Sequence, residues 1–202
     1  SLLAGPYGSQ GAETSDPGST DIHFSKGPSW ISFENPVGSI VPTSEPWKIN
    51  ALRVEWDASG TSFLFRMARL DNNLGTPVAM GPLLLDLYID INHTAGAGSI
   101  SLLPGRPGAV VARDAWEYAM TVSGWGAFLY RSTSRPGPAP ASRLRASADH
   151  RNGEIKVFVP ARLLKGNPGR WGFVAVAMAV DQTTAASATP VQPLSNPKTG
   201  AI

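Results

Sequence analysis

The sequence contains no cysteine among its 202 residues. This absence excludes a disulfide scaffold, a thiolate metal site, a cysteine nucleophile and a c-type haem attachment site. Charged residues are also scarce, at 16% of the chain against about 25% in an average soluble domain. The formal net charge is only +2, so the chain lacks the broad cationic surface on which nucleic-acid binders rely.

Long hydrophobic runs are missing as well. The longest apolar run covers residues 172–180, whereas a membrane-spanning helix needs about 20 apolar residues. We therefore expect no membrane insertion. The sequence starts with Ser1 instead of Met, as a secreted protein does once its signal peptide has been removed. The expected location is extracellular, at a cell surface.

Glycine and proline are abundant, with 21 and 18 residues, and they interrupt the chain in three places. Residues 1–30 and 183–202 carry little hydrophobic periodicity, and residues 132–142 form a proline-rich, extended loop. The sequence thus predicts an extended N-terminal arm over residues 1–30, a β-sandwich domain over residues 31–182 and an extended C-terminal tail over residues 183–202.

The central region alternates short apolar-periodic segments with turn residues, and each such segment predicts a strand. The predicted strands are residues 30–33, 47–57, 62–70, 83–91, 115–123, 125–131, 154–160 and 173–180. Only residues 161–165 look helical, for one short turn. Many strands with turns every 8–12 residues or so predict an all-β, antiparallel β-sandwich.

Polar side chains gather where the segment 83–91 ends. Asp86, Tyr88 and Asp90 share one face, and the other face carries Leu85, Leu87, Ile89 and Ile91. Ca²⁺ takes six to eight oxygen ligands from carboxylates, amides and main-chain carbonyls. Residues of this kind here, which we take as candidate calcium ligands, are Asp90, Asn92, Asp86, Asp114 and Glu117.

Two alternatives compete with the calcium interpretation. Asp90 and Asn92 are residue types that often only hydrogen-bond the turn that follows them. Asn92 also begins the only N-x-S/T sequon of the chain, so it is a possible glycan attachment site. A glycan on this side chain and a metal bound through it are nearly exclusive, and we favour the metal.

Four sequence pieces occur in order: YIDINHTAGAGS, then WEYA with GWG and a tyrosine, then VFVPARLL, then RWGF. Over about residues 47–181 this pattern resembles the C-terminal module of glucodextranases and surface amylopullulanases. Those modules are among the DOMON-like β-sandwiches similar to family-9 carbohydrate modules. The resemblance implies a jelly-roll sandwich, an ion at the Asp90 loop, and a module that stands beside a separate catalytic domain. Asn92 departs from it, because relatives usually have aspartate there.

Tryptophan and tyrosine rings stack on the flat faces of sugars, so they are candidate carbohydrate-binding residues. Trp125 lies between two glycines in a turn, which favours exposure, and Trp47 follows a proline near a strand start. Tyr88 is the third candidate because it shares the polar face of its strand. The alternative for each ring is ordinary packing in the sandwich core.

No enzyme is predicted. The sequence has no GxSxG nucleophile turn, and nothing singles out a pair of its carboxylates as a glycosidase acid and base. No haem is expected either, although DOMON-like sandwiches are able to hold one. Three of the four methionines lie in apolar strand segments, where core packing explains them.

Arginines cluster around the proline-rich loop, and Arg135, Arg143 and Arg145 are candidate interface residues. They would contact acidic groups on a second copy or on an anionic cell-surface glycan. Extended arms add strands to open sheet edges. Our main hypothesis is therefore a non-catalytic, calcium-stabilised subunit of an extracellular filament, tube or sheath, with copies of itself as partner. The alternative hypothesis is a carbohydrate- or cell-envelope-binding module.

Overall fold

The computed structural model describes residues 2–4, 20–23, 29–34, 48–106, 108–133 and 142–179. Its strands are β1 (Leu2–Ala4), β2 (Thr20–His23), β3 (Ser29–Glu34), β4 (Ile49–Asp57), β5 (Gly60–Met67), β6 (Leu83–Asp90), β7 (Tyr118–Ser123), β8 (Gly126–Arg131), β9 (Ser142–Asp149), β10 (Glu154–Pro160) and β11 (Gly172–Ala179). Two 3-10 turns, η1 (Ala112–Asp114) and η2 (Pro168–Arg170), complete the elements. No helix of the described residues has the length and apolar character needed to cross a membrane.

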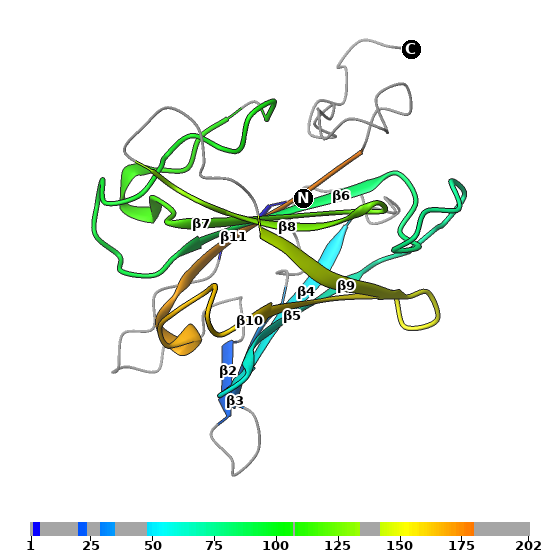
Figure 1. The fold of residues 1–202 in the computed structure, drawn as a ribbon, viewed down its shortest axis with the longest axis horizontal. Coiled ribbons are helices and arrows are strands. Elements are labelled where there is room, and N and C mark those ends of the chain that lie inside the picture. Colours follow the sequence, from blue (N-terminus) through cyan, green and yellow to red (C-terminus); the bar gives the residue numbers. More distant parts are fainter. Residues whose placement is uncertain are drawn as a thin grey trace.

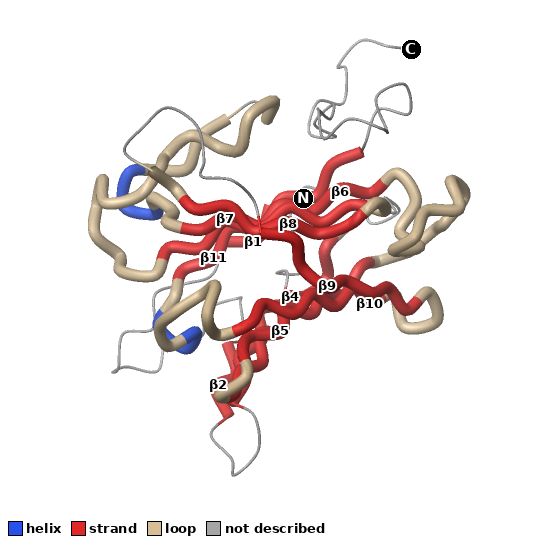
Figure 2. The backbone as a smooth tube through the Cα atoms, in the orientation of Figure 1, coloured by secondary structure: helices blue, strands red, loops and turns tan. Residues whose placement is uncertain are grey.

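All strand pairs are antiparallel and form one continuous series, β1-β11-β6-β7-β8-β9-β10-β5-β4-β3-β2. In space this series folds into two layers (Figures 1 and 2). One layer contains β11, β6, β7 and β8, and the other contains β10, β5 and β4. Strand β9 pairs with both β8 and β10, so it joins the layers along one side. The predicted antiparallel β-sandwich is confirmed, in a nearly closed, barrel-like form.

The main core fills the space between the two layers. Side chains such as Phe63, Phe65, Leu87 and Ile155 are fully buried there. Burial of such side chains stabilises the fold by about 1.5–3 kcal/mol each. The β4–β5 hairpin turns at residues 58–59 because Asp57 accepts hydrogen bonds from the backbone and hydroxyl of Ser59. These bonds lower the pKa of Asp57.

Two expectations about local structure differ from the observed fold. Residues 161–165 form a turn instead of a helix, in which the amide of Leu163 donates to the carbonyl of Pro160. Strand β9 was not expected. Its inward side chains include Ala146 and Ala148, which carry a weaker hydrophobic signal than the branched and aromatic residues typical of strands.

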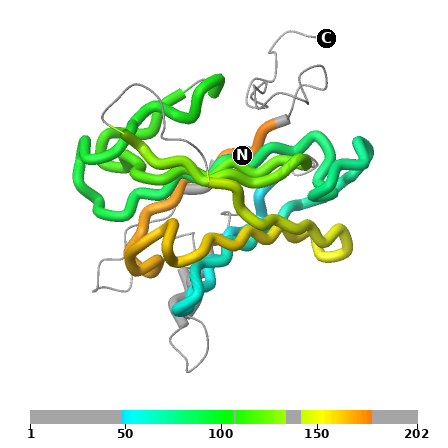
Figure 3. Tube along the Cα trace, in the orientation of Figure 1, coloured from blue at the N-terminus to red at the C-terminus, as the bar shows by residue number. Residues whose placement is uncertain are grey.

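Figure 3 follows the chain from β4 to β11 through both layers.

A second, smaller core lies on the outer face of β6, β7 and β11. Residues 99–106 and 108–116, here called the cap, cover that face and bury Tyr88 and Trp116 against Leu103. The cap is held by a bridge between Ser99 and Trp116 and by a hydrogen bond from the Trp116 indole to the carbonyl of Ser101, at 2.9 Å. Strand β6 is therefore buried on both faces, whereas its alternation suggested one polar face.

The described parts of the N-terminal region extend the sheets of their own chain. Strand β1 pairs with β11, β3 pairs with β4, and β2 pairs with β3. Strand addition from an arm to a second copy was the main support for the filament hypothesis, and these pairings do not supply it. The rest of the predicted arm 1–30 and the whole tail 183–202 lie outside the described residues.

Candidate binding sites at the Asp90 turn and the Trp125 hairpin

Asp90 closes the turn that follows β6. Its Oδ1 atom accepts hydrogen bonds from the backbone amides of Asn92, at 3.1 Å, and His93, at 2.7 Å. Asn92 then accepts a bond from the amide of Thr94, at 2.7 Å. The predicted alternative, in which these side chains cap their own turn, is thus present in the structure.

Glu117, which directly precedes β7, reaches the same turn. Its Oε2 atom accepts from the amide of Ile91, at 2.9 Å, and its Oε1 atom accepts from Nδ2 of Asn92, at 2.6 Å. The structure therefore brings Asp90, Asn92 and Glu117 together. The amide nitrogen of Asn92, the atom that a glycan would use, faces a carboxylate.

The second carboxylate oxygen of Asp90 is the unusual atom of this turn. Oδ2 is buried and accepts no hydrogen bond from the described residues. The nearest cationic candidate is Nδ1 of His93, at 3.4 Å, in a geometry that does not form a hydrogen bond. The other ring nitrogen, Nε2, donates to the carbonyl of Arg170, at 2.6 Å. A buried carboxylate oxygen without a donor is open to a cation or a water molecule.

Asp86 does not join this turn. Under the cap, its carboxylate accepts two hydrogen bonds from Arg106, with Nε to Oδ2 at 2.7 Å and Nη2 to Oδ1 at 3.2 Å. The Arg106 side chain is only 6% exposed and Asp86 is fully buried. Asp86 is therefore saturated by a guanidinium. Asp114 lies on η1 with Arg113 at 3.6 Å, and within the described ranges no three His, Cys, Asp or Glu residues form a metal-binding group.

Tyr88 belongs to the same buried network. Its hydroxyl donates to Oδ2 of Asp86, at 3.1 Å, and accepts from the amide of Leu103, at 3.1 Å. The ring is 1% exposed, so it has no free face for a sugar. We withdraw Tyr88 as a carbohydrate-binding candidate, because the cap covers the face that the strand pattern suggested would be open.

Burial and charge set the protonation states of this network. Burial, together with the charge of Asp86, raises the pKa of Tyr88 well above its usual range. Burial also raises the pKa of Tyr130. For Arg106, burial alone would lower the pKa, but the hydrogen bonds and the charge of Asp86 outweigh it, so the pKa is raised. The network thus contains one ion pair and neutral phenols.

Trp125 is exposed, with 37% of its surface accessible. It lies at the tip of the β7–β8 hairpin. Trp116 and Trp171 are buried, and Trp56 packs against the main core. Trp47, the other predicted sugar platform, lies outside the described residues.

The hairpin that carries Trp125 is fixed to a neighbouring loop. The carbonyl of Gly124 accepts from the amide of Val78, at 2.9 Å. A side chain at position 124 would place its Cβ 2.4 Å from Oγ1 of Thr76, so only glycine permits this approach. Thr76 in turn donates twice to Asn72.

Arg143 and Arg145 lie on β9 and are exposed. Arg143 pairs with Phe128 of β8, and Arg145 pairs with Phe158 of β10. Arg135, the third predicted interface arginine, lies outside the described residues.

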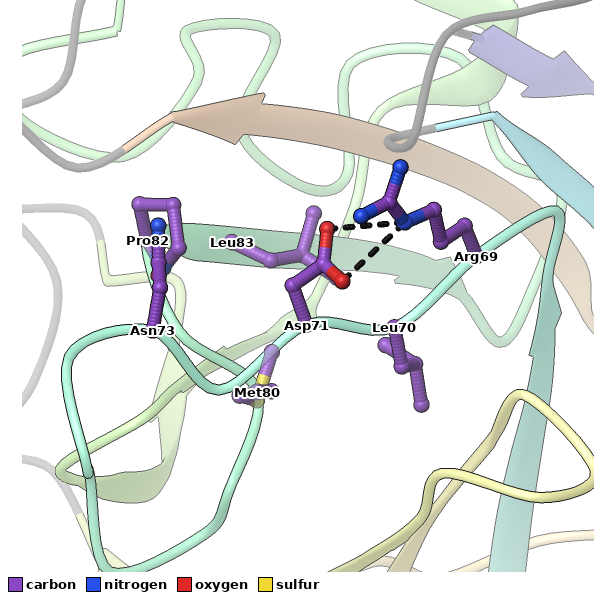
Figure 4. A pocket seen from close by; sticks show the side chains of 7 residues that line it. All are labelled: Arg69, Leu70, Asp71, Asn73, Met80, Pro82 and Leu83. Carbon is purple, nitrogen blue, oxygen red and sulfur yellow. Dashed lines mark hydrogen bonds and ion pairs between the residues drawn. The ribbon is translucent and has the colours of Figure 1, made fainter.

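A shallow hollow of about 70 Å³ opens beside β6 (Figure 4). Its lining residues are Arg69, Leu70, Asp71, Asn73, Met80, Pro82 and Leu83. Arg69 forms an ion pair with Asp71, at 3.0 Å. The volume is far below the ~300–1,000 Å³ of a small-molecule pocket, so we place no ligand there.

Comparison with known families decides the affiliation of the chain. Residues 41–200 match the family described as the C-terminal binding module, SLH-like, of glucodextranase. The chain belongs to this family. The predicted resemblance is confirmed, and the family is one of binding modules, not of catalytic domains. A search of curated proteins found no match. The match favours the binding-module alternative over the filament hypothesis.

Proposed function

We propose that this module binds a carbohydrate at a cell surface or in the cell envelope and catalyses no reaction. The observation that carries the proposal is the family match over residues 41–200. One structural feature agrees with it, because the module presents an exposed aromatic ring at Trp125.

Trp125 is the proposed contact to the sugar. A large aromatic ring on a fixed support loses little conformational freedom when it binds, and it offers a wide apolar face. The hairpin provides this support, because Gly124 packs against Thr76 and the Trp125 amide donates to Oγ of Ser123, at 3.3 Å. We infer that the ring covers one face of a sugar unit in a glycan that extends along the surface.

The test is retention on insoluble or immobilised glycans, with binding measured by depletion of the protein from solution. Trp125→Ala should reduce retention at least tenfold and leave the thermal unfolding midpoint within a few degrees of the wild type. Val111→Ala is the matched control, because Val111 is a large apolar residue on the cap with 57% exposure. Equal retention of wild type and Trp125→Ala would contradict the role of Trp125, and failure to bind any glycan or envelope fraction would contradict the function.

We also propose that Ca²⁺ binds at the Asp90 turn. Support comes from the buried Oδ2 atom of Asp90 that lacks a hydrogen-bond donor. The five candidate ligands do not assemble, because Asp86 is engaged by Arg106 and Asn92 donates to Glu117. A site with so few free oxygens binds weakly, in the range of about 10⁻⁴–10⁻³ M that extracellular calcium modules show.

A further inference from the structure

The outer face of the sheet around β8 and β9 carries an aromatic ring beside an arginine. Phe128 and Arg143 are directly paired across the two strands. Directly opposed residues share one face, with their Cβ atoms about 4.5–5.5 Å apart. Phe128 is half-buried and Arg143 is exposed. The pair therefore forms a ledge with an apolar part and a cationic part.

The guanidinium of Arg143 extends toward the Trp125 hairpin. A Cβ atom built on Gly126 would lie 4.0 Å from Nη2 of Arg143 and 3.7 Å from the ring of Phe128. The two side chains thus converge above Gly126, the residue bonded to Trp125. Gly126 directly follows Trp125 and consecutive Cα atoms are about 3.8 Å apart, so the cation lies beside the backbone of the hairpin tip that carries the exposed ring.

Arg143 and its neighbour Arg145 form no ion pair with the described residues, in contrast to Arg53 and Arg106. Arg53 pairs with Glu55, at 2.9 Å, and Arg106 pairs with Asp86, at 2.7 Å. Arg143 and Arg145 face the same side of β9, two residues apart. Their charges are therefore available to an external anion.

We propose that the glycan bound by this module is acidic, and that the surface formed by Trp125, Phe128, Arg143 and Arg145 recognises sugar units that bear carboxylates. The inference rests on the proposed function and adds the class of ligand to it. Arginine suits this role because its planar fork of N–H groups matches the two oxygens of a carboxylate. Trp125 and Phe128 contact the sugar ring, and Arg143 selects the charge.

The experiment compares neutral glucans with their carboxymethylated forms, for example dextran and carboxymethyl-dextran of equal length, by retardation in affinity gels. We expect the wild type to bind the carboxymethylated polymer about fivefold more tightly at low salt, as one exposed charge pair allows. The difference should shrink at high salt because mobile ions screen exposed charges. Arg143→Gln should remove the difference while retaining binding to the neutral polymer. Trp125→Ala should weaken binding to both.

Arg151→Gln is the matched control, since Arg151 is exposed in the turn at the opposite end of β9. It makes the same charge change and should preserve the preference. Equal binding of neutral and carboxymethylated polymers would overturn this inference while leaving the proposed function intact. Equally tight binding of poly-L-glutamate would also overturn it, because the charge alone would then suffice. No binding to any polymer would contradict the proposed function and this inference with it.

Discussion

Asp86 and Arg106, 20 residues apart in the sequence, form a two-pronged ion pair beneath the cap. Asp86 projects from the outer face of β6, and Arg106 reaches down from the cap. The same guanidinium also donates to the hydroxyl of Thr121 on β7, at 3.3 Å, and to the carbonyl of Pro104, at 3.0 Å. One arginine thus links the cap to two strands of the sheet.

Breaking this pair should destabilise the module strongly. Arg106→Met leaves the carboxylate of Asp86 as a buried charge without a cationic partner, which costs about 3–5 kcal/mol. The double variant Asp86→Leu/Arg106→Met should cost much less than the sum of the two single changes, because it leaves no charge behind. The free energies of unfolding are measured by denaturant titration.

The matched comparison is Arg69→Met, because Arg69 forms an exposed ion pair with Asp71, at 3.0 Å. Exposed pairs contribute about 0–1 kcal/mol, so this variant should unfold at nearly the wild-type denaturant concentration. If Arg106→Met were as mild as Arg69→Met, the cap would not depend on the buried pair.

Tyrosine titration provides a second prediction. The pKa of Tyr88 is raised in the folded protein from its ordinary value of 10.0, so the folded state holds this proton more tightly than the unfolded state does. The stability that depends on the neutral phenol is therefore complete below about pH 10 and is lost as the pH rises above it. Near-ultraviolet phenolate absorbance should rise at higher pH in the folded protein than in urea.

Tyr88→Phe should reduce the gap between the folded and the unfolded titration curves. Tyr130→Phe should reduce it as well, because burial also raises the pKa of Tyr130. Coincident curves for the folded and the unfolded wild type would show that water reaches both phenols, and would exclude the closed network under the cap.

Much of the fold could be predicted from local pattern. The segment that became β6 alternates from Leu85 onward, and the predicted strands 47–57 and 62–70 leave a short connection where the turn after Asp57 lies, so both features were placed correctly. Strand β9 was missed because alanine and serine provide little contrast between its faces. Burial of the polar face of β6 could not be predicted, since it depends on a cap that returns from residues 99–116.

The candidate site also contains residues that local pattern predicts and residues that only the three-dimensional structure brings together. Asp90, Asn92 and Glu117 meet as the strand pattern suggested. Asp86 shares a strand face with Asp90, but its carboxylate forms an ion pair with Arg106, which comes from a glycine- and proline-rich loop. No periodicity marks Arg106, because its partner is set by the path of the loop. Long-range ion pairs of this kind are visible only in three dimensions.

Gly124 and Trp125 are neighbours with opposite predicted roles. Gly124→Ala would place a methyl group 2.4 Å from Oγ1 of buried Thr76, and overpacking of this kind costs about 1–3 kcal/mol. Trp125→Ala removes an exposed ring and should leave stability nearly unchanged while reducing glycan retention at least tenfold. Thermal unfolding and retention are measured on both variants. If Trp125→Ala lost stability and Gly124→Ala did not, the Trp125 ring would be part of the core and not a binding platform.

Calcium should stabilise the module through Asp90. A ligand present at about ten times its dissociation constant adds about 1.4 kcal/mol to the free energy of unfolding, which raises the midpoint of a domain of this size by about 3–6 °C. We expect this increase at about 10 mM Ca²⁺, if the site binds in the millimolar range of extracellular calcium modules. We also expect its reversal by a chelator and its loss in Asp90→Asn, which replaces one carboxylate oxygen by an amide group. Asp114→Asn serves as the control, because Asp114 lies on η1 beside Arg113. If Ca²⁺ did not change the unfolding midpoint of the wild type, or raised the midpoint of Asp90→Asn equally, calcium binding at Asp90 would be contradicted. The buried oxygen of Asp90 would then be hydrated by water instead.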